Sequence, residues 1–242
     1  MKSIKKIIFI LLGGILIFII ISTTYENITY HNKLNNFLKD QILLEDKSTD
    51  NNKYYYKSDS SYYTSDSYMN PGSCCDILVT TDSSIEIPVL HDILDLTVGG
   101  HAGLCGMSYQ DKYYTISNTD TIDTAYNDLD NKTTIYPASK WNESSEYPNY
   151  YILRVSLTKD EAYIVYNELV SNLGEPYNLT FLLNTKTSSY CSDLISKAFR
   201  KVNKNLNYDF GATTVIDLLA SKYTEIVGYK VCKNGINYYY TI

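Results

Sequence analysis

The stretch Tyr190-Cys191-Ser192-Asp193-Leu194-Ile195 decides how this chain is interpreted. Apolar residues recur at helical spacing through Ile195, Ala198 and Val202, so we expect an amphipathic helix that begins near Cys191, with Ser188 or Ser189 as its N-cap. Unpaired N–H groups and the helix dipole at such a position favour a thiolate, which makes Cys191 a candidate nucleophile. The alternative is a small buried hydrophobic residue on the apolar stripe, and position alone does not decide between the two.

A thiolate enzyme also needs a base, and the chain has 3 histidines. His31 lies in a segment expected to be a stalk, and His91 is flanked by aspartates in a stretch that reads as a solvated loop. His101 stands in Gly99-Gly100-His101-Ala102-Gly103, where small neighbours leave room for backbone or substrate to approach the ring. We therefore take His101 as the candidate base.

Composition limits the possible classes of function. The 242 residues allow one domain of ordinary size with appendages, and a hydrophobic fraction of 44% is enough for a core. A net charge of -6 argues against nucleic acid as a partner, because phosphate binding needs clustered Lys and Arg. Tyrosine is unusually frequent, with 26 residues, and a tyrosine-rich surface would suit glycan or peptide contacts.

The N-terminal residues 1–25 have the pattern of an export signal or a membrane anchor. Lys2, Lys5 and Lys6 precede an uncharged apolar run over residues 7–21. No small-residue cleavage site of the A-x-A kind follows, which favours an uncleaved anchor, and a cleaved signal is the alternative. We expect the rest of the chain to be exported, either held at the cell membrane with an extracellular domain or secreted.

Residues 26–70 are expected to form a stalk and a linker. Leu34, Phe37, Leu38 and Ile42 recur at steps of three and four, which predicts a short amphipathic helix leading away from the membrane. Residues 47–70 contain almost no aliphatic side chain and predict a flexible tether.

Residues 71–242 are expected to form the folded domain. Short β-rich runs predict strands over residues 74–81, 101–107, 113–117 and 150–156, with the second and third joined as an antiparallel hairpin. Thr158 and Glu161 form a capping box that predicts a helix start, and Gly174 supplies its left-handed stop.

Several motifs together resemble a known family. They are Cys75-Asp76-Ile77-Leu78, Gly100-His101-Ala102-Gly103-Leu104, Leu153-Arg154-Val155, Gly174-Glu175-Pro176-Tyr177-Asn178 with Phe181, and Tyr190-Cys191-Ser192-Asp193-Leu194-Ile195. In order and spacing they resemble the circularly permuted papain-like families, in the YiiX-like and YaeF-like branch of the NlpC relatives. The resemblance covers about residues 71–205. It implies an α+β fold with a permuted papain-like core, in which an antiparallel sheet carrying His101 packs against helices.

The resemblance also implies an acyl-thioester mechanism and further site residues. It places Ser117 as the third catalytic member, with Asn118 as its rival, and Tyr190 and Tyr177 as substrate-binding residues. The chain departs from the family pattern at Cys75, where Gly is usual, at Asn178, where Asp is usual, and at Asp193, where Glu is usual. Arg154 reads as a structural ion-pair partner and stands outside the site.

We expect no cofactor and no metal. Cys74, Cys75, His91, His101 and Cys105 lie close in sequence, but on one strand His101 and Cys105 would be about 13 Å apart at ~3.3 Å per residue, too far to share a tetrahedral ion. A disulfide from Cys105 to Cys74 or Cys75 is a hypothesis based on the expected adjacency of the first two strands. The pairing of Cys232 stays open.

The sequence therefore supports two hypotheses of different classes. One is an exported cysteine hydrolase, an amidase or peptidase, or an acyltransferase, acting on peptide, isopeptide or lipid acyl groups, the peptide bonds of the cell wall among them. The other is a surface binding module that keeps the fold with a weak or inactive site.

Overall fold

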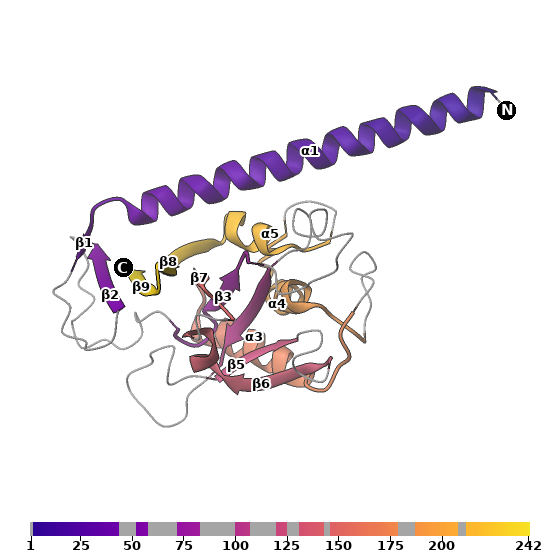
Figure 1. Cartoon of the computed structure of the whole chain (residues 1–242). Helices are drawn as coiled ribbons and strands as arrows, with labels where there is room; N and C mark the ends of the chain where they lie inside the picture. Colours follow the sequence, from indigo (N-terminus) through magenta and orange to yellow (C-terminus); the bar gives the residue numbers. More distant parts are fainter. Residues whose placement is uncertain are drawn as a thin grey trace.

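The structure is a computed structural model that describes residues 2–43, 52–57, 72–82, 100–106, 120–124, 131–142, 146–178, 187–207 and 212–242. Within these residues the fold is α+β, as predicted (Figure 1). The helices are α1 (Lys2–Leu38), α3 (Lys159–Ser171), α4 (Cys191–Arg200), α5 (Val215–Ala220) and the 3-10 helix η3 (Ala138–Asn142). The strands are β1 (Gln41–Leu43), β2 (Asn52–Lys57), β3 (Ile77–Thr80), β4 (His101–Cys105), β5 (Asp120–Thr124), β6 (Thr133–Pro137), β7 (Asn149–Val155), β8 (Thr224–Lys233) and β9 (Ile236–Thr241).

The strands form one sheet in the order β1-β2-β9-β8-β7-β3-β4-β5-β6. Neighbouring strands are antiparallel except β2 and β9, which are parallel. Three of the expected strands correspond to β3, β4 and β7. The expected strand over residues 113–117 lies outside the described residues, and β4 pairs instead with β5.

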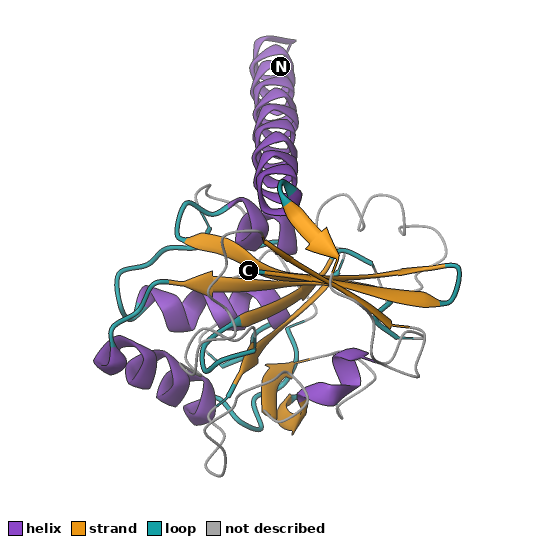
Figure 2. Cartoon of the chain, turned by 90° about the vertical axis from the view of Figure 1, so that its left-hand side faces the viewer, coloured by secondary structure: helices purple, strands orange, loops and turns teal. Residues whose placement is uncertain are grey.

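Two apolar clusters cover the two faces of the sheet, because alternate residues of a strand point to opposite sides. Ile77 and Val79 of β3 belong to the first cluster, and Leu78 between them belongs to the second. The first cluster is filled by α3, α4, α5 and the C-terminal half of α1, through Val165, Leu169, Leu194, Ile195, Ala198, Phe199, Leu218, Leu219, Tyr30 and Phe37. The second is smaller and aromatic, with Trp141, Tyr136, Tyr147, Tyr150 and Ile152. Figure 2 shows the helices against the twisted sheet.

The capping box predicted for α3 is confirmed. The Thr158 hydroxyl accepts the Glu161 N–H at 3.2 Å, and a Glu161 carboxylate oxygen accepts the Thr158 N–H at 2.8 Å. Gly174 has the predicted left-handed conformation, with φ +85°, two residues beyond the C-cap Asn172. Val165 and Leu169 of this helix are fully buried in the first cluster.

Helix α1 differs from the expected stalk. A single helix runs from Lys2 to Leu38, and in Figure 1 it passes over the domain beside β8 and α5 before its N-terminal half projects beyond it. The apolar side chains of residues 4–21 are exposed, and the helix is long and apolar enough to cross a membrane. Residues 22–38 instead pack on the domain, because Tyr30 and Phe37 are buried in the first cluster.

The expected tether also contains a strand. Residues 52–57 form β2, which pairs in parallel register with β9. The ring of Tyr55 stacks on Tyr240 at 4.6 Å and that of Tyr54 on Tyr239 at 5.1 Å, on opposite sides of the sheet. A count of aliphatic residues misses this contribution, because stacked tyrosines bury large apolar area without any aliphatic side chain. Residues 44–51 and 58–71 lie outside the described part of the chain.

The cysteines are all free thiols. The hypothesised disulfide from Cys105 to Cys74 or Cys75 is therefore not formed, and the reason lies in strand geometry. The Cys105 side chain belongs to the second cluster, whereas Cys75 belongs to the first, on the other face of the sheet. The backbones of these residues are nevertheless adjacent, since the Cys75 N–H donates to the Cys105 carbonyl at 2.9 Å.

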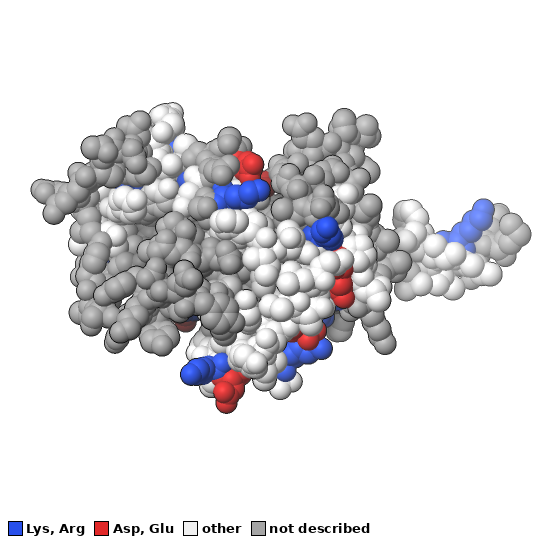
Figure 3. All heavy atoms as spheres, turned by 90° about the horizontal axis from the view of Figure 1, so that it is seen from below, with Lys and Arg blue, Asp and Glu red and all other residues white. Residues whose placement is uncertain are grey.

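On the face shown in Figure 3, a few charged side chains of both signs are scattered among uncharged residues. Two cross-helix ion pairs stabilise the packing of α3 beside the C-terminal end of α4. Lys201 pairs with Glu168 at 3.1 Å, and Lys204 pairs with Glu161 at 3.7 Å.

Candidate active site around Cys191

Cys191 is the first residue of α4. The helix begins after Tyr190, which has the extended conformation of an N-cap but makes no side-chain cap. The expected caps, Ser189 and Ser188, lie one and two residues upstream of the N-cap, because Ser189 pairs with Tyr177 in an isolated bridge that keeps the chain extended. The first N–H groups of α4 therefore receive no capping side chain from Tyr190, and Cys191 lies among them. Its side chain is buried in the first cluster.

His101 begins β4 opposite Thr80. It is 6% exposed, and its ring stacks on Trp141 at 5.6 Å and on Tyr147 at 6.1 Å, with interplanar angles of 10° and 18°. These aromatic residues come from η3 and the segment before β7, and nothing in the spacing of the sequence pointed to them. They place the imidazole in an aromatic stack on the face of the second cluster.

The start of α4 and the start of β4 converge on one segment, residues 213–215. The Ser192 hydroxyl donates to the Thr213 carbonyl at 2.7 Å. Two residues later, Val215 packs so closely on Gly100 that a Cβ there would be 2.8 Å from its Cγ2 atom. This segment therefore contacts the residue that follows Cys191 and the residue that precedes His101.

The two candidate side chains nevertheless lie in different clusters. Cys191 shares the first cluster with Ala102 and Leu104 of β4, whereas His101 alternates with Ala102 and stacks in the second. The structure thus brings together the helix and the strand that carry the candidate pair, and packs the His101 ring on the opposite face of the sheet.

The phenols of Tyr177 and Tyr190, the two residues predicted to bind substrate, lie near Cys191. Burial raises the pKa of Tyr177, and the neighbouring Cys191 and Tyr190 raise it further. Burial also raises the pKa of Tyr190, with a further contribution from Asp193, against a hydrogen bond with the Thr213 backbone that lowers it. Both phenols consequently stay protonated at neutral pH.

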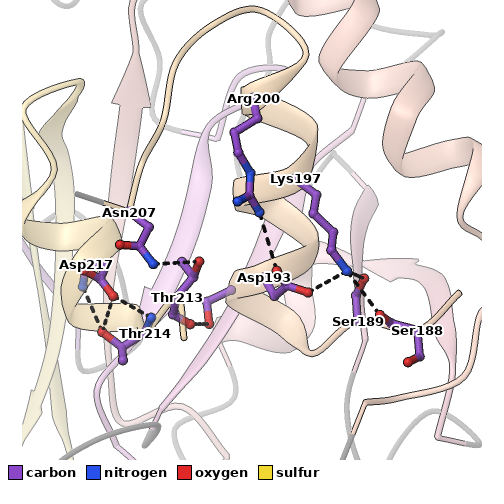
Figure 4. A network of polar contacts seen from close by, with 10 residues as sticks. Ser188, Ser189, Asp193, Lys197, Arg200, Asn207, Thr213, Thr214 and Asp217 are labelled. Carbon is purple, nitrogen blue, oxygen red and sulfur yellow. Dashed lines mark hydrogen bonds and ion pairs between the residues drawn. The ribbon is translucent and has the colours of Figure 1, made fainter. Parts of the chain in front are cut away.

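Asp193 has a structural part in this region (Figure 4). Its carboxylate pairs with Lys197 at 2.7 Å and with Arg200 at 3.6 Å. The Lys197 ammonium also donates to the Ser188 carbonyl and the Ser189 hydroxyl, at 3.1 and 2.9 Å. Through Lys197, Asp193 fixes the segment that leads into Cys191 against the first two turns of the helix.

A second polar group supports the segment 213–215. The Asn207 amide donates to the Thr213 hydroxyl at 3.3 Å. Thr214 caps α5 in a capping box with Asp217, whose carboxylate accepts the Thr214 N–H at 2.7 Å. The segment that contacts both Ser192 and Gly100 is therefore held at two successive residues.

Of the other residues singled out in the sequence, the structure describes Arg154 but not Ser117, Asn118 or His91. Arg154 is an ion-pair partner, as expected, and it binds Asp76 in a bidentate manner with both distances at 2.8 Å. Ser117, Asn118 and His91 lie outside the described residues. Where the structure describes the chain, no three His, Cys, Asp or Glu side chains are grouped to hold a metal ion.

Comparisons with known proteins are sparse. No protein-family model matches the sequence, and no curated protein matches it significantly. Among solved structures, the metalloprotein YiiX from Escherichia coli O157:H7 is similar, with a TM-score of 0.49 and 12% identity, over 64% of this chain and 96% of that one.

Proposed function

We propose that this protein is an exported cysteine hydrolase, an amidase or peptidase, or an acyltransferase, with a permuted papain-like core in which Cys191 is the nucleophile and His101 the proton carrier. The observation that carries the proposal is the convergence of α4 and β4 on residues 213–215. Thr213 holds the residue next to the nucleophile, and Val215 packs on the residue next to the histidine. The sequence motifs around both residues support the same assignment.

In the proposed reaction, the His101 ring leaves its aromatic stack, turns toward Cys191 and accepts the thiol proton. The Cys191 sulfur then attacks the carbonyl carbon of the substrate. The tetrahedral intermediate collapses to a thioester as His101 gives that proton to the departing amine or alcohol. Water, or an acceptor in the acyltransferase, then attacks the thioester, and its proton returns through His101 to the sulfur. The early N–H groups of α4 and the phenols of Tyr177 and Tyr190 are the candidate donors to the oxyanion. Ser117 or Asn118 is the proposed third member.

The substrate class follows from the thioester chemistry and the expected export. Peptide, isopeptide and lipid acyl groups all present a carbonyl to a thiolate, and cell-wall peptides are the first substrates to test. No cofactor takes part in this scheme.

Alkylation kinetics of the full-length protein in detergent test the enzyme. Iodoacetamide at pH 6, followed by peptide mapping, should label Cys191 faster in the wild type than in His101→Ala. Turnover of wall fragments or lipid esters should disappear in Cys191→Ala and persist in Cys232→Ala, whose thiol lies on β8. Equal labelling of Cys191 with and without the imidazole would eliminate the proposed pair.

A binding module is the second candidate, and one observation favours it. The His101 ring stacks on Trp141 and Tyr147, on the face of the sheet opposite to the cluster that contains Cys191. If the protein is a binding module, the wild type and Cys191→Ala should bind wall fragments equally well, and neither should turn them over.

We further propose that α1 is a retained membrane anchor rather than a cleaved signal. Residues 4–21 expose apolar side chains and include only two basic residues, Lys5 and Lys6, and the same helix then enters the first cluster. Cleavage after the apolar run would sever a helix whose C-terminal half is part of the core. Detection of the N-terminal peptide in the membrane fraction by mass spectrometry would support retention, and a mature chain that begins after residue 21 would refute it.

A further inference from the structure

Two adjacent thiols, those of Cys74 and Cys75, lie in the turn before β3 and have no part in the proposed chemistry of Cys191. The Sγ atoms of Cys74 and Cys75 are 3.6 Å apart. Cys75 has a φ of +67°, a left-handed conformation that is unfavourable for a residue with a Cβ atom. The left-handed Cys75 residue lies in the turn that holds the two sulfur atoms close together.

The turn is held in place on several sides. The Asp76 carboxylate accepts the N–H groups of Gly72 and Ser73, at 2.9 and 3.0 Å, as well as both hydrogen bonds from Arg154. The N–H of Cys75 donates to the Cys105 carbonyl on β4. Because its ends are fixed, the turn keeps the two thiols close.

The two thiols have unequal surroundings. Cys74 is partly exposed, whereas Cys75 is 4% exposed and its Sγ lies 3.4 Å from the Ala162 carbonyl of α3. The hydrogen bond from Cys75 lowers the pKa of Cys74, and the same bond together with burial raises the pKa of Cys75. Cys74 is therefore the thiol that ionises first and that a reagent reaches first.

We propose that Cys74 and Cys75 form a redox modification site, which a small-molecule disulfide converts reversibly into a vicinal disulfide. The Cys74 thiolate attacks one sulfur of the reagent and releases one thiolate, which leaves a mixed disulfide on Cys74. The Cys75 thiol loses its proton to solvent and attacks the Cys74 sulfur, which releases the second thiolate. In total the protein loses two electrons and two protons, and the reagent is reduced to two thiols.

Closure requires a modest movement. The sulfur atoms must approach from 3.6 Å to the bond length of about 2.05 Å, and Cys75 must turn away from the Ala162 carbonyl. Oxidation thereby removes a contact between the turn and α3 and leaves Cys191 as a thiol.

Oxidised glutathione, added to the full-length protein in detergent, tests the proposal. After blocking with iodoacetamide, the peptide that contains Cys74 and Cys75 should lack both alkyl groups and weigh two hydrogen atoms less than its reduced form, and dithiothreitol should reverse the change. The same result is expected in Cys232→Ser. Cys75→Ser should retain a stable glutathione adduct on Cys74, and Cys74→Ser, which replaces the partly exposed thiol, should form no adduct within this peptide.

Three results would overturn the assignment. They are a persistent glutathione adduct on Cys74 in the wild type, full alkylation of both thiols after oxidation, and a bridge from either thiol to Cys105. Because the readout is a mass, it is independent of catalytic activity and of the role of Cys191.

Discussion

The ammonium group of Lys33 on α1 donates to the carbonyl of Leu219 at the end of α5, at 3.0 Å. It also donates to the carbonyls of Ser221 and Thr224, the latter at 2.7 Å. One side chain of the N-terminal helix thus satisfies carbonyls at the end of α5 and at the start of β8. This contact joins the helix with the exposed apolar half to the end of α5, the helix that begins within the segment 213–215.

Replacement of Lys33 by Met should destabilise the protein by about 2 kcal/mol, because it removes charge-assisted hydrogen bonds and leaves carbonyls without this donor. Urea unfolding in detergent, followed by circular dichroism, measures the effect. Lys39→Met is the matched control, since Lys39 is exposed just beyond the helix. Equal unfolding midpoints for the two variants would contradict the structural role of Lys33.

Shortening the chain should distinguish the part of α1 that belongs to the core from its exposed apolar part. A chain of residues 22–242 keeps Tyr30, Phe37 and β2 and should unfold cooperatively. A chain of residues 71–242 loses all three, and the loss of a buried Phe side chain alone removes about 3–5 kcal/mol from a total of roughly 5–15 kcal/mol. Thermal unfolding should therefore show a transition only for the longer chain, and a cooperative transition in both would be inconsistent with a docked helix.

Substitution of Gly100 should be far more harmful than substitution of Gly174. An alanine Cβ at position 100 would overlap the Thr80 carbonyl and approach Val215, and φ is +93°. The expected loss is more than about 3 kcal/mol. Gly174→Ala has a similar φ of +85° with no atom within 4 Å, and should lose only about 1–2 kcal/mol of backbone energy. The unfolding free energies of Gly100→Ala and Gly174→Ala test this prediction. Equal losses in the two variants would contradict the close contacts at Gly100.

Lys230 should make the free energy of unfolding depend on pH in the alkaline range. Burial lowers the pKa of Lys230 to about 8, and its ammonium donates to the Asn142 and Tyr147 carbonyls, each at 3.0 Å. Between pH 8 and 10 the unfolded chain holds a proton that the folded chain has released, so stability should rise with pH over this range. Buried tyrosines oppose the rise above about pH 10, since burial raises the pKa of Tyr239 to about 12.

The measurement is the unfolding free energy of wild type and Lys230→Met at pH 7.5, 8.5 and 9.5. The wild type should gain stability relative to the variant as pH rises. Parallel pH profiles for the two proteins would show that Lys230 ionises normally in the fold.

Much of the local structure could be predicted from the sequence, because the signals act over a few residues. The Thr158 and Glu161 capping box acts over three residues, and the structure shows both of its hydrogen bonds. The start of α4 was predicted near Cys191, yet its N-cap is Tyr190 rather than Ser188 or Ser189. That cap depends on the bridge between Ser189 and Tyr177, a contact that no local pattern encodes.

Contacts between distant segments could not be predicted in this way. Residues 52–57 lack aliphatic side chains, but their tyrosines stack on those of β9 at the other end of the chain, which makes a strand of an expected tether. In the same way, the position of Lys33 in the sequence gives no indication that carbonyls of residues 219–224 lie beside it.

The amino-acid order alone determined the apolar helix at the N terminus, the strand that carries His101 and the helix that begins at Cys191, since propensity and periodicity act along the backbone. Tertiary packing decided which groups each side chain contacts on its face of the sheet. Alternation along β4 places His101 and Ala102 on opposite faces of the sheet. Cys191 lies with Ala102 only because α4 packs on one face, and the imidazole lies in the aromatic stack only because Trp141 packs on the other.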